Sequence, residues 1–355
     1  MVSAFSGVIG HRPLLRLLEG EAETPAQAYL FVGPASVGKA TVARRFAALL
    51  LGGEEDESCR RRVVAGLHPD LTLVEPDGAT SLTVDQARAT VARAVLAPVE
   101  AGCKVILFEE AGLMTDEAAS ALLKSLEEPT PTTVFILVAE AEDDLPLTIA
   151  SRCRTVYFGR VTDDEVVAAL GERGVEPEQA GQAAAASGGR PGLALLLATR
   201  PEVAAFRRAW LSVPSRLTAQ PGDAFRLAEE LAGAAGPLLE AMDDRHRQER
   251  GQAEEENVAS RNLKERQERE RKRASGVLHV TGLEILASWY RDAAAAQFGA
   301  PVRNRDLPTP TLTALTPPAA VSAARRVLAA IAALEANQRP ELAFATLFHD
   351  LGTAH

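Results

Sequence analysis

Short apolar runs alternate with helix-like stretches over the first 160 residues of the chain. The run KVILF at 104–108 is apolar after its lysine, as a central strand buried on both faces of a parallel sheet should be. Strands are predicted at 29–32, 71–74, 104–108, 134–138 and 155–158, with helices between them at 40–51, 84–96 and 118–126. Strands that alternate with helices in this way predict an α/β domain, a parallel sheet with helices on both faces.

From Thr162 onward the pattern is wholly helical. We expect Asp163 or Asp164 to cap a helix that runs to Leu170. Two further short helices are predicted at 178–186 and 193–198, and prolines 308, 310, 317 and 318 are expected to break the chain before a last helix at 319–336. The predicted organisation is therefore an α/β domain at 1–160, a small helical lid domain at 161–205, and an all-α collar or oligomerisation domain at 206–355.

The segment 243–273 is dominated by charges of both signs. Ten Lys and Arg residues nearly cancel nine Asp and Glu residues, and pairs such as Glu265 and Arg269 have the favourable spacing of four residues. Such a segment is typical of a solvent-exposed helix or a poorly ordered insertion. The alternative is a docking surface for DNA or a partner, because 269–273 is locally basic.

Composition and charge narrow the function classes. The formal charge of −10 is unlike that of a general polyanion binder, so DNA contact is expected from a local patch or from partner subunits. Three scattered cysteines form neither a disulfide framework nor a four-ligand zinc site. We find no segment near the roughly 20 apolar residues that span a bilayer, and we expect a cytoplasmic protein without membrane partners.

The sequence GPASVGKAT at 33–41 directly follows a predicted strand and opens a predicted helix. In a phosphate-binding loop, glycines let backbone N–H groups turn toward phosphate oxygens, and a lysine reaches the β- and γ-phosphates. The Ser or Thr that normally follows the lysine and binds Mg²⁺ is Ala40, and Thr41 points about 100° away around the helix. The candidate nucleotide-binding residues of this loop are Gly33, Ser36, Gly38, Lys39, Ala40 and Thr41.

The predicted strand at 104–108 ends in two acids. P-loop ATPases carry an Asp here that helps hold Mg²⁺, often followed by a Glu that polarises the attacking water. Glu109 takes the first position and is one methylene longer than Asp, and Glu110 takes the second. We therefore regard Glu109 as a candidate cofactor-binding residue and Glu110 as a candidate catalytic residue of a degenerate site.

Several motifs together resemble the AAA+ clamp-loader family of DNA replication. They are the ALLKSLEEP helix at 121–129, the VFIL strand, the Ser151-Arg152-Cys153 triplet, the segment at 8–11 that lies by the adenine in this family, and the lid signature SGGRPG at 187–192 with Arg190. The resemblance is strong over residues 5–200. Beyond them it rests chiefly on Trp289-Tyr-Arg-Asp292, which is similar to a short collar motif.

The departures from the family pattern suggest which kind of member this is. Motor subunits keep the Ser or Thr, the Asp and a polar sensor residue where this chain has Ala40, Glu109 and Ala139. Arg152 is retained, and the resemblance implies that it is an arginine finger acting in trans on a neighbouring subunit's ATP. The resemblance also implies as partners the tau/gamma and delta clamp-loader subunits in a hetero-oligomeric ring, the sliding clamp, and primer-template DNA through the assembled complex.

The cofactor expectation is ATP or ADP with weak Mg²⁺, and no resident cofactor is certain. Family members often carry a four-cysteine zinc module before the second strand, but only Cys59 stands there, with His68 nearby, so no zinc is expected. Two alternatives remain open. One is a catalytically active tau/gamma-like motor with Glu110 as base, and the other is an AAA+ ring ATPase of recombination.

Overall fold

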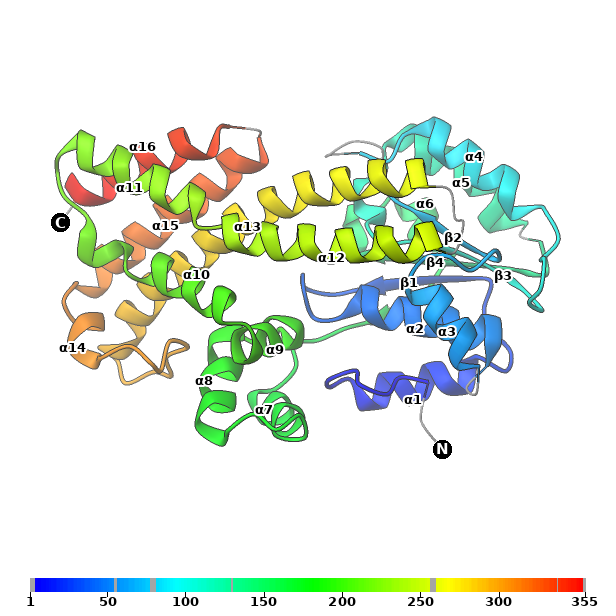
Figure 1. Cartoon of the computed structure of the whole chain (residues 1–355), viewed down its shortest axis with the longest axis horizontal. Coiled ribbons are helices and arrows are strands. Elements are labelled where there is room, and N and C mark those ends of the chain that lie inside the picture. Colours follow the sequence, from blue (N-terminus) through cyan, green and yellow to red (C-terminus); the bar gives the residue numbers. More distant parts are fainter. Residues whose placement is uncertain are drawn as a thin grey trace. The chain divides into compact units, whose positions relative to one another are not determined.

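The computed structural model of the chain describes residues 4–53, 56–76, 81–128, 130–255, 260–336 and 338–353. The chain divides into two compact units, whose elements are labelled in Figure 1. The sheet unit runs to Arg173 and includes residues 189–193, and the helical unit holds residues 174–188 and the chain from Ala194 onward. The division into three domains at 160 and 205 stays a prediction.

Five parallel strands form the sheet of the first unit in the order β2-β3-β4-β1-β5. Their bounds are β1 Ala28–Val32, β2 Leu71–Val74, β3 Lys104–Phe108, β4 Thr133–Ala139 and β5 Arg154–Tyr157. All five predicted strands are therefore present, with ends shifted by at most one residue. Because the strands are parallel, the residues that follow each one meet at the same edge of the sheet.

Helices cover both faces of this sheet. Successive residues of β1 show the alternation, since Tyr29 and Phe31 pack into the core with α1, α2 and α3 while Leu30 and Val32 pack into the opposite core with α4, α5 and α6. The bounds are α1 Arg12–Glu21, α2 Lys39–Gly52, α3 Glu57–Val64, α4 Val84–Ala94, α5 Asp116–Glu127, α6 Leu147–Ala150 and α7 Asp163–Gly171, with short 3₁₀ helices η1 Ala111–Leu113 and η2 Glu142–Asp144. The α/β fold class expected from the sequence is confirmed.

Threonines begin several helices of this unit, although Asp56 caps α3. Thr162 caps α7 by accepting the backbone N–H of Glu165, whose side chain bonds back to Thr162 in a capping box. The prediction of Asp163 or Asp164 as the cap is wrong, because both lie in the first turn, where their charges favour the helix dipole instead.

In the helical unit, the helices from Pro201 onward pack around one apolar core. Trp210, Tyr290, Phe344 and Phe348 are its largest fully buried side chains. The helices are α8 Pro177–Ser187, α9 Pro191–Thr199, α10 Pro201–Leu211, η3 Val213–Arg216, α11 Pro221–Gly233, α12 Gly236–Glu255, α13 Ser260–Ala296, α14 Thr309–Leu312, α15 Pro317–Glu335 and α16 Pro340–Thr353. The all-α character predicted for the C-terminal part of the chain is confirmed.

The C-terminal helices differ from the prediction in two ways. Pro317 and Pro318 occupy the first positions of α15 instead of breaking the chain, because the missing N–H of proline costs nothing in the first turn of a helix. The helix at 319–336 is also not the last one, since α16 follows it and buries Phe344 and Phe348.

The charged segment 243–273 is helical where it is described. It spans the end of α12 and the start of α13, where Arg271 Nε donates to Asp243 Oδ2 at 2.9 Å and Gln267 donates to the carbonyl oxygen of buried His246 at 3.2 Å. Residues 256–259 and the side chains of 245, 248–266, 269, 270 and 273 lie outside the described residues. The choice between a solvated helix and a docking surface stays a prediction.

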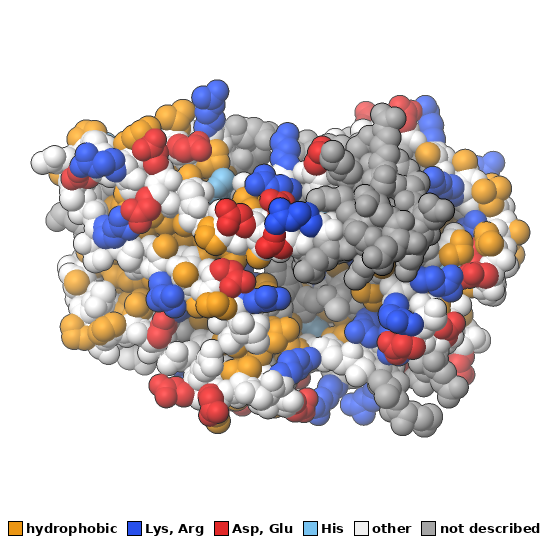
Figure 2. Space-filling view, in the orientation of Figure 1, with side chains coloured by type: hydrophobic (Ala, Val, Ile, Leu, Met, Phe, Trp, Pro, Cys, Tyr) orange, Lys and Arg blue, Asp and Glu red, His pale blue; other side chains and the backbone are white. Residues whose placement is uncertain are grey.

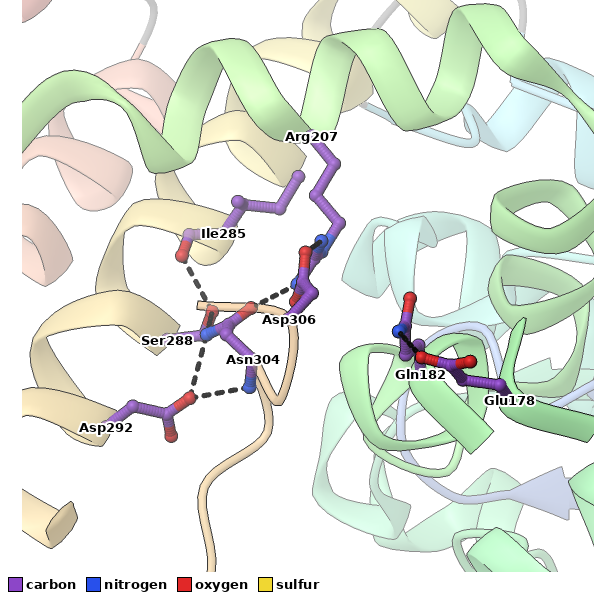
Figure 3. Close-up of polar contacts among 8 residues, drawn as sticks. All are labelled: Glu178, Gln182, Arg207, Ile285, Ser288, Asp292, Asn304 and Asp306. Carbon is purple, nitrogen blue, oxygen red and sulfur yellow. Dashed lines mark hydrogen bonds and ion pairs between the residues drawn. The ribbon is translucent and has the colours of Figure 1, made fainter. Parts of the chain in front are cut away.

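A buried polar network explains the motif Trp289-Tyr-Arg-Asp292 (Figure 3). Asp292 is fully buried, and its Oδ2 accepts the backbone N–H groups of Arg303 and Asn304 at 2.9 and 2.7 Å and the amide of Asn304 at 2.8 Å. Arg207 then grips Asp306 with both Nη atoms, at 2.6 and 2.7 Å, and donates to Asn304. The motif therefore ties the loop after α13 to α13 and α10.

Among the described residues, one helix reaches the length and apolar composition of a membrane span, contrary to the expectation that no segment does. It is the stretch Pro317–Leu334 of α15, of which 22% is buried. One such helix is weak evidence for a membrane-spanning segment. Arg325 and Arg326 lie in its middle, where a charge is costly in a bilayer, and Arg326 donates to the carbonyl oxygen of Asp350.

Candidate functional site

The phosphate-binding loop lies between β1 and α2, as predicted. Gly33, Ser36 and Gly38 all have positive φ, at 153°, 61° and 103°. A Cβ on Gly33 would lie 2.2 Å from the carbonyl oxygen of Phe158, so only glycine fits there. The strand, the turn and the helix that opens at Lys39 together have the shape of an anion-binding loop.

Lys39 is bonded to its own loop. Its ammonium group donates to the carbonyl oxygens of Gly33 and of Pro34, the latter at 2.7 Å, and the residue is buried. Burial lowers the pKa of Lys39, and the nearby carboxylates of Glu140 and Asp144 act in the opposite direction. A phosphate would have to compete with these carbonyl oxygens and with two negative charges for the lysine.

The positions that hold magnesium ligands in other P-loop ATPases do not form a magnesium site in this chain. Ala40 offers no oxygen, and Thr41 is exposed on α2. Glu109, at the end of β3, is held by both prongs of Arg44 from α2, with 2.8 Å between Nη2 and Oε2. These residues therefore do not fit Mg²⁺, because the one carboxylate in the expected place already has a bidentate partner.

The end of β4 carries a feature that the sequence analysis missed. Ala139 ends the strand and is buried, as a sensor position without a polar group. Glu140 follows it, and its backbone carbonyl accepts the N–H of Gly33 at 3.2 Å. The carboxylate of Asp144 accepts the N–H groups of Glu140 and Ala141 at 2.9 and 2.8 Å. Glu140 and Asp144 therefore both lie beside the phosphate-binding loop. The acidic stretch that follows Ala139 in the sequence could have indicated them.

Two other predicted nucleotide contacts, the segment at 8–11 and Arg190, both lie in the sheet unit. His11 Nε2 lies 2.9 Å from the carbonyl oxygen of Val37, which joins the segment at 8–11 to the phosphate-binding loop. Arg190 is half-buried in the stretch that belongs to the sheet unit, where the carbonyl oxygen of Gly189 accepts the N–H of Val161. The candidate roles of Arg190, Glu110 and the loop residues stay predictions.

At the place of the zinc module, Cys59 is buried and His68 is hydrogen-bonded to other residues. Cys59 is buried in α3, and both ring nitrogens of buried His68 are engaged. Its Nδ1 accepts the N–H of Asp70 at 3.1 Å, and its Nε2 lies 2.9 Å from Glu100. Across the described ranges no cluster of three His, Cys, Asp or Glu side chains could hold a metal ion.

Arg152 lies on the surface just after the short helix α6. Its Nη1 donates to the carbonyl oxygen of Thr148 at 2.8 Å, and its Nη2 lies 2.6 Å from Oε1 of Glu127 at the end of α5. The side chain keeps 35% of its exposure. Leu147, the first residue of α6, is 81% exposed.

The sequence of the sheet unit matches known replication proteins. Residues 12–162 fit the family model described as DNA polymerase III, delta subunit. The chain is 37% identical to subunit delta′ of Bacillus subtilis over 166 residues, which are 45% of this chain and 50% of that protein. It is 42% identical to subunit delta′ of Pseudomonas aeruginosa over 137 residues, 36% of this chain and 42% of that one. The sheet unit resembles the delta prime clamp-loader subunit of bacterial DNA polymerase III.

Proteins with the names subunit tau and subunit gamma are also similar. Subunit tau of Bacillus subtilis is 31% identical over 172 residues, 46% of this chain and 30% of tau. The chain matches half the length of the delta prime relatives or less. Each of these matches covers less than half of this chain. The resemblance expected from the motifs is therefore confirmed for the sheet unit.

Proposed function

We propose that the chain is a delta prime-like subunit of a clamp loader, which helps place the sliding clamp on primed DNA. Its partners are the tau/gamma and delta subunits in a hetero-oligomeric ring, and it meets clamp and DNA within that assembly. In the view of Figure 2, Lys and Arg side chains are interspersed with Asp and Glu on the described part of the surface. That mixture supports DNA contact through the assembly rather than through this chain alone.

The proposal rests on the contrast between a degenerate nucleotide site and the retained Arg152. The loop lacks a hydroxyl at Ala40, Glu109 is committed to Arg44, and Lys39 is bonded to its own loop. Arg152, by contrast, lies on the surface with 35% of its side chain exposed. A chain of this kind contributes to ATP hydrolysis through a neighbour's site rather than its own.

The chemistry of phosphoryl transfer gives Arg152 its role. Negative charge on the γ-phosphate oxygens is stabilised by a guanidinium, and an arginine supplied in trans is worth about 10³–10⁵ in rate at a single site. Only one ATP site of a ring faces this chain, so the effect on the whole complex is smaller.

The test is Arg152→Ala in the clamp-loader complex reconstituted with its cognate subunits. We expect assembly to be unchanged, while DNA- and clamp-stimulated ATP hydrolysis and clamp loading fall. Arg152→Lys should not restore them, because a point charge lacks the planar fork. The control is Arg88→Ala, since Arg88 is a 71% exposed arginine of the same unit. Wild-type rates for Arg152→Ala would show that this chain does not donate the finger.

A second candidate function is that of an active tau/gamma-like motor. The similarity to tau and the retention of Lys39 and Glu110 support it. It requires the isolated chain to turn over ATP with Mg²⁺, which separates it from the first proposal. The finger role, by contrast, requires no turnover by the isolated chain.

A further inference from the structure

Arg152 is not presented as a free guanidinium. One Nη donates to the carbonyl oxygen of Thr148, and the other forms an ion pair with Glu127, which ends α5 25 residues earlier in the chain. Each Nη group carries two N–H bonds, and on each group one acceptor of this chain is already bound. A phosphate that bound both Nη groups through their remaining N–H bonds would therefore lie next to these two acceptors.

Glu127 is the acceptor that conflicts with a phosphate. Its carboxylate lies 2.6 Å from Nη2, so a phosphate gripping the same edge would place two negative groups next to each other. The carbonyl oxygen of Thr148 is neutral and poses no such conflict. Contact with a nucleotide therefore favours exchange of Glu127 for the phosphate, because like charges at short range repel.

The ion pair is weak enough to be exchanged. The side chain of Arg152 is 35% exposed and that of Glu127 is 47% exposed, so water screens their attraction. Exposed pairs of this kind shift an equilibrium by roughly 1.4-fold to fivefold. The contact thus restrains the arginine in the free chain without trapping it.

We propose that Glu127 is a positioning residue, which holds Arg152 against the surface of the free chain and releases it to a neighbour's nucleotide on assembly. The inference rests on the proposed function of Arg152. It differs from that function in predicting that the loss of a negative charge raises the activity of the complex, whereas the loss of Arg152 lowers it.

The first test uses Glu127→Gln in the reconstituted complex. Glutamine keeps the size and the acceptor oxygen but removes the charge. We expect hydrolysis at the one ATP site that faces this chain to rise by up to about fivefold, so that kcat of the whole complex rises by less than that. KM for ATP should stay within about twofold, because the finger acts mainly in the transition state. In an Arg152→Ala background, Glu127→Gln should have no effect, since its action depends on that arginine.

The matched control is Glu128→Gln, which removes the same charge at the next residue, also exposed. It should leave kcat at the wild-type value. If Glu127→Gln leaves kcat unchanged or lowers it while Arg152→Ala lowers it, the release by Glu127 is wrong and the finger role stands. If Arg152→Ala has no effect either, the proposed function itself fails.

A second measurement examines the restraint without any partner. Phenylglyoxal modifies accessible arginines, and peptide mass spectrometry reports the modification of Arg152 alone. In the free, full-length chain we expect Glu127→Gln to speed this modification by up to about fivefold relative to both wild type and Glu128→Gln. Equal rates in the three proteins would overturn the restraint, whatever the complex does.

Discussion

Glu109 and Arg44 form a bidentate ion pair that joins the end of β3 to the second turn of α2. The two charged groups are only 17% and 24% exposed, and Arg44 also donates to the carbonyl oxygen of Val64 at 2.8 Å. The acid that would face Mg²⁺ in a motor subunit instead ties two helices to the strand. In this chain the position therefore has a structural contact in place of a metal ligand.

Removing the charge of Glu109 should destabilise the sheet unit. Glu109→Gln leaves the partly buried guanidinium of Arg44 without its charged partner, and we expect the free energy of unfolding to fall by about 1–3 kcal/mol. Urea denaturation monitored by far-UV circular dichroism measures it. The control is Asp85→Asn, because the pair of Asp85 with Arg88 is 3.7 Å long and largely exposed, and its loss should cost at most a few tenths of a kcal/mol. Equal losses in the two variants would contradict the role of Glu109.

The isolated chain should hydrolyse ATP at a rate close to background. Mg²⁺ finds no hydroxyl at Ala40, and Lys39 is held by its own loop. Phosphate release in the presence of Mg²⁺ measures the rate, with Lys39→Ala as the control for a contaminating ATPase. Turnover typical of P-loop ATPases that disappears in Lys39→Ala would favour the motor function instead.

Gly282 should be essential to the helical unit. A Cβ at this position of α13 would lie 2.0 Å from the indole ring of Trp210, which is fully buried. Gly282→Ala should therefore lower the free energy of unfolding by about 1–3 kcal/mol or more and change the near-UV circular dichroism of the tryptophans. Gly276→Ala, in the same helix but with open space around the new methyl group, should be neutral or stabilise by up to about 1 kcal/mol. A neutral Gly282→Ala would show that the indole can move aside.

Asp306 should make the helical unit sensitive to acid. The hydrogen bonds from Arg207 lower its pKa against the opposing effect of burial. A lowered pKa in the folded state means stability that is present above the unfolded pKa of about 3.9 and is lost as the pH falls through the folded value. Arg207→Gln should cost about 1–3 kcal/mol at pH 6, and a smaller part of that cost should remain near pH 3. Urea denaturation at both pH values measures it. An identical cost at both would contradict the linkage.

The exposed face of α15 should serve the proposed collar. Val321 and Leu328 are 45% and 57% exposed and lie seven residues apart, on one side of the helix. In the reconstituted complex, Val321→Glu with Leu328→Glu should abolish stable association while the chain keeps its circular dichroism spectrum, because a charge in an apolar interface is costly. Size-exclusion chromatography reports association, with Leu196→Glu, on α9, as the control. Full association of the double variant would exclude this face from the interface.

Local sequence patterns predict the strands of the sheet well and the starts of the helices less well. The buried strands, such as β3, form uninterrupted apolar runs, and their ends were predicted to within a residue. The cap of α7 was misplaced because Thr162, Asp163 and Asp164 are all good capping residues in sequence, and only the geometry selects one. The start of α15 was misjudged because proline both breaks helices and begins them.

In the candidate site, local sequence predicts the positions of residues but not their partners. The motifs located Lys39, Glu109 and Arg152 correctly at the ends of strands and helices. Their partners could not be predicted, since Arg44 lies 65 residues from Glu109 and Glu127 lies 25 residues from Arg152. Nothing in local sequence indicates which of many arginines and glutamates meet. Those pairings decide whether the acid binds a metal and whether the arginine is free.

The sheet of this chain ends on both sides in strands of four residues, β2 and β5. The edge at β5 is further blunted by charge, since Arg154 pairs with Glu21 and the exposed Tyr157 donates its hydroxyl to Glu142. So short an edge offers few main-chain groups to an incoming strand. In the proposed ring, neighbouring subunits therefore gain little by extending the sheet. Side-chain contacts then account for more of their association, so that single substitutions can loosen it one contact at a time.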